Sequence, residues 1–216
     1  MALKASLRIF FGGTFDPPHS AHFELPHRVR EELDSPDAWL IYVPAAQSPH
    51  KDIAPTPDHH RVAMLEIALG NRERCVIWDT ELARTQYHPD KPSFWADTWD
   101  TVNAAGSLGD NRFLIGADQA LAMHRWHRFE SIWRDAIVMM RDEHEAPRQL
   151  IEALAETGAW DQEQLAHWRA SIVRVPMIDA SSTHIRAMLR DPETRKNPIA
   201  TLDDRVHQYI LEHSLY

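Results

Sequence analysis

The chain has 216 residues, of which 44% are hydrophobic and 25% are charged, a composition typical of one ordinary globular domain with a packed core. Its net charge of −9, from 23 basic and 32 acidic residues, argues against a broad nucleic-acid-binding surface. No apolar stretch is long enough to cross a bilayer, and Ile9–Phe11 is too short for a signal-peptide core. We therefore expect one cytoplasmic domain over residues 1–216, with no nucleic-acid or membrane partner.

Cysteine and histidine content bears on metal and redox chemistry. The single cysteine, Cys75, fits a reducing compartment, and its apolar surroundings predict a packed core residue and not a nucleophile. The 14 histidines raise the question of a metal site. No Cys or carboxylate partners follow them with the spacing of a structural zinc site, so we expect no protein-held metal.

The first predicted elements are a strand, a loop and a helix. Residues 7–11 form a short apolar run that predicts a buried strand, and Ala21–Leu33 predicts a helix. Between them, Gly12 and Gly13 permit a tight turn and leave no side chain in the way of a ligand. The helix directs its free N–H groups and positive dipole end to the same place, which suits an anion. The pattern predicts a phosphate site; an ordinary turn is the alternative.

Two histidines stand at the start of this helix. Because His19 and His22 are three residues apart, they face the same side of the helix. Two imidazole donors would then converge on one oxyanion. A pair of purely structural histidines is the alternative.

A second strand is predicted over Ala38–Val43, ended by Pro44. The loop that follows is rich in proline and contains Lys51, a candidate phosphate contact because ligands sit at the carboxyl ends of parallel strands. A solvated surface lysine is the alternative. Asp58–Leu69 predicts a helix ended by Gly70.

The middle of the chain predicts a third strand over Cys75–Asp79 and a loop over residues 81–89. Ser93 is then expected to cap a helix that runs to about Gly106. The aromatic residues at the start of this helix either line a ligand pocket or pack into the core, and for Trp99 we favour the core.

Asn111–Asp118 predicts a strand whose end carries Asp118. A carboxylate at this position can accept hydrogen bonds from ribose hydroxyls, or it can cap the next helix. The fifth strand is predicted over residues 136–140 and a last short strand over residues 171–175. The polar segment 145–170 between them predicts helix broken by Gly158.

The segment Asp179–Arg186 predicts a second phosphate site at a helix start. Ser and Thr cap its first turn, and Arg186 follows one turn after Ser182 on the same side. An ordinary helix cap with a surface arginine is the alternative. Together, the alternating elements predict a Rossmann-like parallel α/β sheet of five or six strands with helices on both faces. Its ligand cleft is expected at the carboxyl ends of the strands.

Several of these segments resemble motifs of one family. Residues 12–22 resemble the G-G-T-F-D-P-x-H-x-G-H signature of the nucleotidyltransferase superfamily, and the Pro-Pro version is most similar to the nicotinate mononucleotide adenylyltransferases. Residues 180–186 resemble the I-S-S-T-x-I-R motif of the same superfamily, and the resemblance extends over nearly the whole chain. The chain departs from the pattern at Ala21, where the signature has Gly, and at Phe94 and Trp95, where the family has Tyr and Thr.

The resemblance implies transfer of the adenylyl group of ATP to nicotinate mononucleotide, with Mg²⁺ accompanying ATP. The residues that it assigns to catalysis are His19, His22, Lys51 and Arg186. Those that it assigns to ATP are Gly12, Gly13, Thr14, Phe15, Gly116, Asp118, Ser182 and Thr183. Those that it assigns to the pyridine nucleotide are Ser93, Phe94, Trp95 and Trp126.

Other functions stay open at this point. Trp95 leaves room for a nicotinamide mononucleotide or dual-specificity enzyme, and a sister nucleotidyltransferase would share both motifs. A class I aminoacyl-tRNA synthetase fragment would need a K-M-S-K-S-like loop, which the chain lacks. A non-catalytic nucleotide-binding module would be expected to lose His19, His22 or Arg186. Whether the chain forms a homo-oligomer is also open.

Overall fold

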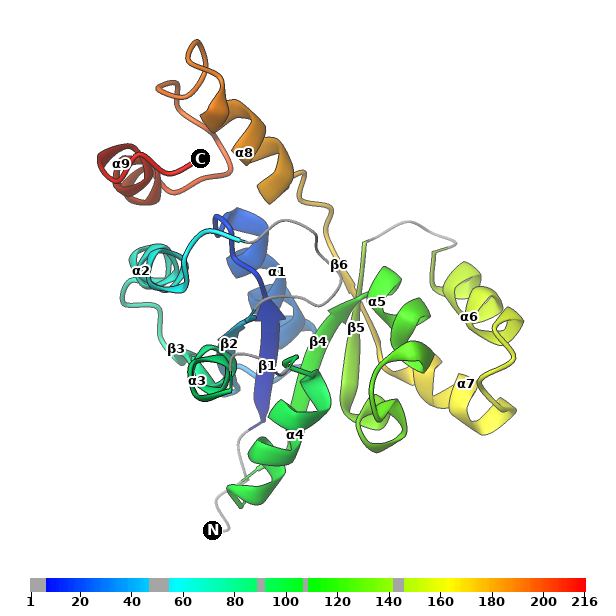
Figure 1. Cartoon of the computed structure of the whole chain (residues 1–216). Helices are drawn as coiled ribbons and strands as arrows, with labels where there is room; N and C mark the ends of the chain where they lie inside the picture. The colour runs from blue at the N-terminus through cyan, green and yellow to red at the C-terminus, as the bar shows by residue number, and fades with distance from the viewer. Residues whose placement is uncertain (1–6, 47–54, 89–91, 107–108, 142–145) are drawn as a thin grey trace. The chain divides into compact units, whose positions relative to one another are not determined.

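A computed structural model describes residues 7–46, 55–88, 92–106, 109–141 and 146–216 (Figure 1). Its centre is a six-stranded sheet in the order β3-β2-β1-β4-β5-β6, the arrangement of dinucleotide-binding folds. The strands are β1 (Arg8–Gly13), β2 (Trp39–Pro44), β3 (Cys75–Ile77), β4 (Asn111–Gly116), β5 (Ala136–Arg141) and β6 (Ile172–Val175). The predicted parallel α/β fold is confirmed.

Helices connect the strands. They are α1 (Ser20–Glu32), α2 (Asp58–Leu69), α3 (Thr80–Tyr87), α4 (Trp95–Ala104), α5 (Ala117–Ala122), α6 (Ala146–Glu156), α7 (Gln162–Ala170), α8 (Ser182–Arg190) and α9 (Asp204–Glu212), with short 3₁₀ turns η1 (Met123–Arg125), η2 (Phe129–Ser131) and η3 (Trp133–Asp135). None of the described helices combines the length and apolarity that a bilayer crossing requires.

Most predicted elements are present, with three corrections. The segment from Thr80 to Tyr87, predicted mainly as a loop, forms α3, because Leu82 gives it a buried face. Ser93 does not cap α4, since Phe94 occupies the N-cap position and Ser93 lies one residue outside it. Cys75 in β3 is half-buried and not enclosed in the core.

The chain divides into two compact units. The first comprises residues 1–12, 25–41 and 94–177, and the second comprises residues 13–24, 42–93 and 178–216. Each unit carries part of the residues that the sequence singles out.

Parallel strands form the core of the first unit. Phe10 of β1 pairs with Phe113 of β4, and Phe113 pairs with Ala136 of β5. Trp99 of α4 packs against this layer, 1% exposed, and its indole N–H donates to the Asp135 carboxylate at 2.7 Å. The expectation that Trp99 belongs to the core is therefore confirmed.

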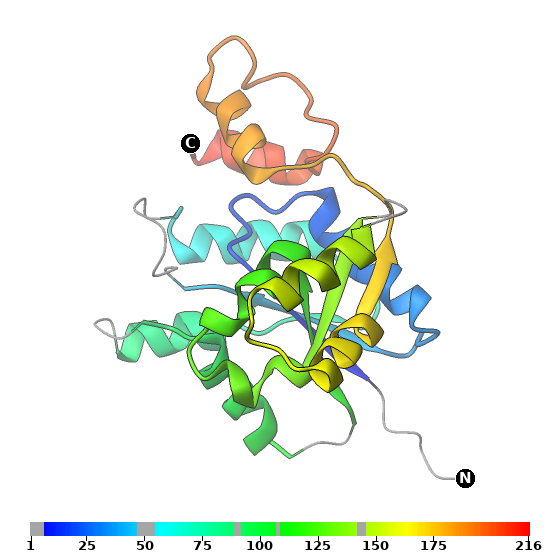
Figure 2. The same cartoon turned by 90° about the vertical axis from the view of Figure 1, so that its right-hand side faces the viewer.

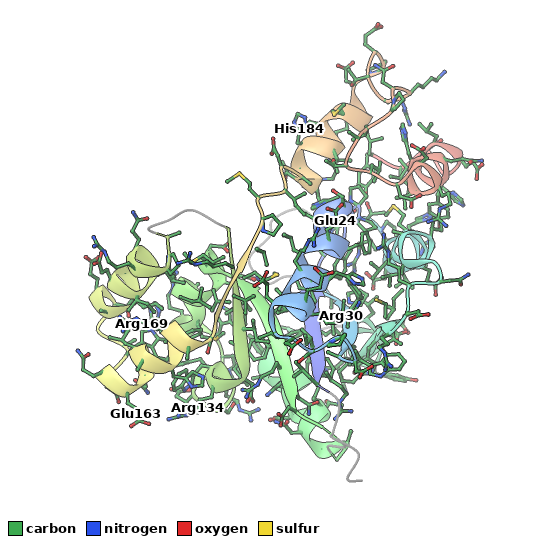
Figure 3. The ribbon with its side chains drawn as sticks, turned by 180° about the vertical axis from the view of Figure 1, so that it is seen from behind. Glu24, Arg30, Arg134, Glu163, Arg169 and His184 are labelled. Carbon is green, nitrogen blue, oxygen red and sulfur yellow. The ribbon has the colours of Figure 1, made fainter. Side chains whose placement is uncertain are left out.

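A second aromatic cluster in the same unit joins η3 to α7 and to the turn that precedes α7. Trp133, Trp160 and Trp168 lie with ring centroids 5.3 to 5.8 Å apart. The Arg134 guanidinium, labelled in Figure 3, covers the Trp133 ring at 4.7 Å. Helices α6 and α7 pack together (Figure 1), with Gly158 between them at φ 69°.

The second unit is built on α2, which packs against α9. Figure 2 shows the two last helices of this unit, α8 in orange and α9 in red. His60 of α2 and Tyr209 of α9 share a hydrogen bond of 2.8 Å between Nδ1 and the hydroxyl oxygen. The same unit contains the loop that follows β1 and the start of α8.

Candidate active site

Gly13, the last residue of β1, is required by the chain's own geometry. Phe15 has a φ of 49°, in the left-handed region that bulky residues seldom adopt, and its ring folds back over Gly13. A Cβ atom at position 13 would lie 2.9 Å from the Phe15 ring. Phe15 itself is 1% exposed. Gly13 therefore accommodates an aromatic ring of the protein where the sequence suggested room for a ligand.

A buried arginine fixes the loop from Gly13 to His19. Arg61 of α2 is fully buried. Its guanidinium donates to the Thr14 carbonyl at 2.7 Å, to the Thr56 carbonyl at 3.0 Å and to the Asp58 carboxylate. The sequence analysis missed Arg61, since one arginine within a predicted helix gives no signal that distinguishes it from a surface charge.

His19 and His22 lie together at the start of α1. Their ring centroids are 3.8 Å apart, and the backbone N–H of His19 donates to Nδ1 of His22 at 3.1 Å. Accepting at Nδ1 places the ring proton of neutral His22 on Nε2. Burial lowers the pKa of His19 to about 4. Burial, and then the neighbouring His19, lower the pKa of His22. Both rings are therefore neutral at pH 7, and each can offer one N–H to an anion.

The start of α8 contacts the same loop. The Ser182 hydroxyl donates to the Pro17 carbonyl at 2.9 Å, and Arg186 donates to the Asp16 carbonyl at 2.6 Å and to the Thr183 hydroxyl at 3.2 Å. The two segments that the sequence predicts as phosphate sites are thus brought together within the second unit.

The prediction that a serine stands at the cap of α8 is confirmed for its position, but no serine hydroxyl makes the capping bond. Ser181 holds the N-cap position in extended conformation, without a side-chain capping bond, and the Ser182 hydroxyl is turned to Pro17. The N–H groups at this helix start are not satisfied by a serine side chain of the cap, so they suit an anion.

Gly116 and Asp118 lie in the first unit, at the carboxyl end of β4. Gly116 is the N-cap of α5, and its N–H donates to the side chain of Gln119 at 3.0 Å. Asp118 is therefore in the first turn of the helix and is not its N-cap, which corrects that alternative. Its carboxylate is exposed and folds over Gly116, where a Cβ atom would lie 2.8 Å from Oδ1.

The aromatic candidates also belong to the first unit. Trp95 packs against Gly12, and a Cβ atom there would lie 2.9 Å from the indole ring. The indole nitrogen of Trp95 is buried without a hydrogen-bond partner among the described residues. Phe94 stacks on His127 with ring centroids 4.4 Å apart, a partner that the sequence analysis missed. Trp126, half-buried, follows η1.

The two remaining candidates from the sequence are Ser93 and Lys51. Ser93, in the second unit, accepts a hydrogen bond from Arg84 at 3.2 Å. Lys51 lies outside the described residues. Among the described residues, no group of three or more His, Cys, Asp or Glu side chains is arranged to hold a metal ion.

Comparison with known proteins identifies the family of this chain. The model of the cytidylyltransferase-like family matches residues 10–188. A protein from Stenotrophomonas maltophilia named probable nicotinate-nucleotide adenylyltransferase is 30% identical, over 98% of this chain and 97% of its own. Its namesake from Pseudomonas aeruginosa (strain UCBPP-PA14) is 32% identical, over 95% of each chain.

Solved structures show the same fold. The nicotinic acid mononucleotide adenylyltransferase of Plasmodium falciparum, complexed with NaAD, superposes with a TM-score of 0.68 at 17% identity and covers 98% of this chain and 97% of its own. At this low identity, the structural similarity shows a common fold, whereas the sequence matches show the family. The chain belongs to the cytidylyltransferase-like family and, within it, to the nicotinate-nucleotide adenylyltransferases.

Proposed function

We propose that the protein transfers the adenylyl group of ATP to the 5′-phosphate of nicotinate mononucleotide, giving deamido-NAD and pyrophosphate. The observation that carries the proposal is the meeting of the two nucleotidyltransferase motifs in one unit, where Ser182 and Arg186 of α8 bond to Pro17 and Asp16. The names of the relatives support the same activity.

The chemistry needs no covalent enzyme intermediate. A phosphate oxygen of the mononucleotide attacks the α-phosphorus of ATP, and the bond from that phosphorus to the bridging oxygen of pyrophosphate breaks. The attacking phosphate is already an anion at neutral pH, so no proton has to be removed. Catalysis then rests on in-line positioning and on donors placed where charge develops.

The residues of the second unit suit the phosphates. We assign His19 and His22 to the reacting phosphate as neutral donors, and Arg186 and Lys51 to the polyphosphate. Because the Ser182 hydroxyl is engaged with Pro17, Ser182 and Thr183 would act through the backbone N–H groups at the start of α8. The remaining contacts proposed for ATP near β1 are Gly12, Gly13, Thr14 and Phe15.

The residues of the first unit suit the nucleoside parts. The exposed Asp118 carboxylate, with Gly116 beneath it, can accept hydrogen bonds from ribose hydroxyls. Phe94, Trp95 and Trp126 offer aromatic faces for a pyridine ring, and Ser93 precedes them in sequence.

Trp95 favours one alternative activity. Its indole occupies the space over Gly12, which alters the surroundings of a pyridine substituent relative to a family member with threonine. A nicotinamide mononucleotide or dual-specificity adenylyltransferase is therefore the second candidate.

The proposal also covers the metal ion, the extent of the domain and the cellular compartment. We take Mg²⁺ to arrive with ATP, coordinated mainly by phosphate oxygens and water. We propose that residues 1–216 serve as one nucleotidyltransferase domain and that the protein works in the cytoplasm, in keeping with its single cysteine.

A matched pair of histidine variants tests the activity. His22→Ala is expected to lower kcat by about 100-fold to 1,000-fold, the effect of removing one well-placed donor. His184→Ala serves as the control, because His184 is exposed on α8 (Figure 3) and should leave kcat within about twofold of the wild type. Intact turnover in His22→Ala contradicts the proposal.

A further inference from the structure

Asp16, in the loop between β1 and α1, is bonded by segments distant in sequence. The Tyr216 hydroxyl donates to Oδ1 across 200 residues of chain, and the Thr56 N–H donates to Oδ2 at 3.3 Å. Arg186 donates to the backbone carbonyl of the same residue. Asp16 is only 7% exposed, so the bonds from Tyr216 and Thr56 take the place of water at the carboxylate.

The direction of the bond from Tyr216 follows from the chemistry of its partner. The carboxylate oxygen accepts, so the phenol donates. Burial, and then the hydrogen bond to Asp16, raise the pKa of Tyr216. The hydroxyl therefore keeps its proton throughout the pH range in which the protein would work.

Asp16 is joined to His19 by a stiff piece of chain. Pro17 and Pro18 have fixed φ angles, which leaves the segment fewer ways to absorb a displacement of Asp16 before it reaches His19. The far end of the loop is tied down as well, because the Ser20 N–H donates to the Thr201 carbonyl at 2.8 Å. The position of the His19 ring thus depends on both ends of this segment.

We propose that Tyr216 is a positioning residue for adenylyl transfer, whose hydroxyl holds Asp16 so that His19 and His22 are correctly placed. Tyr216 acts through Asp16 and not on the reacting atoms. The kinetic part of the inference rests on the proposed function. The placement of the histidines can be tested without it.

The test compares two single-atom deletions. Tyr216→Phe removes the hydroxyl that holds Asp16. Tyr209→Phe is the control: its hydroxyl is bonded to His60 at 2.8 Å, and its side chain is also half-buried in the second unit. With ATP and nicotinate mononucleotide, Tyr216→Phe is expected to lower kcat about 10-fold to 100-fold, the range for a small misplacement of catalytic groups. The KM for nicotinate mononucleotide should change less than about twofold, and Tyr209→Phe should change neither constant by more than that.

Nitrogen NMR of the imidazole rings supplies the second readout. In the wild type, Nδ1 of His22 accepts from the His19 N–H, which gives this nitrogen a characteristic ¹⁵N shift. We expect that shift to move in Tyr216→Phe and to stay in place in Tyr209→Phe. Asp16→Ala, which removes the acceptor of the Tyr216 hydroxyl, should reproduce the Tyr216→Phe spectrum, and it serves as the second variant if Tyr216→Phe does not fold.

The outcomes separate the two proposals. A wild-type protein without adenylyltransferase activity overturns the proposed function, and the NMR comparison then decides on Tyr216 alone. The inference on Tyr216 is wrong if the His22 signals of Tyr216→Phe, or of Asp16→Ala where that replaces it, match those of Tyr209→Phe. If the wild type is active, the inference on Tyr216 is also wrong when the kcat of Tyr216→Phe stays within twofold of the kcat of Tyr209→Phe.

Discussion

The indole of Trp95 lies over Gly12, in the place that any side chain at position 12 would need. Gly12 is followed by Gly13, whose space is taken by Phe15 in the same manner. Each glycine thus has an aromatic partner from the chain itself. The absence of a side chain at the end of β1 is therefore a packing requirement of the protein itself, in addition to the ATP contact proposed above.

The contact between Gly12 and Trp95 predicts that substitutions at these two positions have non-additive effects on the free energy of unfolding. Gly12→Ala should lower the free energy of unfolding by about 1–3 kcal/mol, because the new methyl group overlaps the Trp95 ring. Trp95→Thr should remove most of that penalty, so that Gly12→Ala costs little in the Trp95→Thr background. Urea unfolding of the four proteins measures the coupling. Simple additivity of the two substitutions would show that the contact does not exist.

The buried histidine pair predicts a pH dependence of stability. The pKa of His19 is near 4 in the folded protein and near its usual value of about 6.5 in the unfolded chain. Below pH 6.5 the unfolded chain takes up the proton and the folded protein does not, so stability falls as the pH drops from about 6.5 to 4. The slope from this residue can reach about 1.4 kcal/mol per pH unit.

Urea unfolding between pH 7 and pH 4.5 checks this dependence. His19→Asn removes the titrating ring, so the slope should be smaller in this variant than in the wild type. Equal slopes in the two proteins would mean that His19 is protonated as readily in the folded state as in the unfolded chain.

Arg186 predicts an effect on ATP binding. Its guanidinium bonds to the Asp16 carbonyl and lies beside Thr183, and we assign it to the polyphosphate. Arg186→Ala should weaken ATP binding at least about tenfold in titration calorimetry, as expected for the loss of a charge-assisted bond. Arg190→Ala, an exposed arginine one turn later on α8, is the control. The same Kd for both variants would remove Arg186 from the ATP site.

The sequence predicted elements well where local signals were strong. Residues 58–69 have a regular apolar spacing followed by Gly70, and α2 has the predicted bounds. The strands over residues 111–116 and 136–141 were recognisable as apolar runs. Helix α3 was missed because its eight residues supply no side-chain capping bond and only a short apolar face.

The main residues of the proposed site could be predicted from the sequence, but the contacts that hold them in place could not. His19, His22 and Arg186 stand in local motifs that the sequence displays directly. The contacts that fix them depend on residues 40 to 200 positions away, as the bonds from Thr56 and Tyr216 to Asp16 illustrate. A single sequence carries no signal for such pairs, because each partner is an ordinary polar residue in its own segment.

Pyrophosphate release tests the central claim most directly. The purified protein is given ATP and Mg²⁺ with nicotinate mononucleotide or nicotinamide mononucleotide in parallel reactions, and kcat/KM is compared. We predict rapid release with the nicotinate form and a strong preference for it over the nicotinamide form. Comparable rates would establish dual specificity and show that Trp95 alters the pyridine contacts. No release with either mononucleotide would contradict the proposed adenylyl transfer.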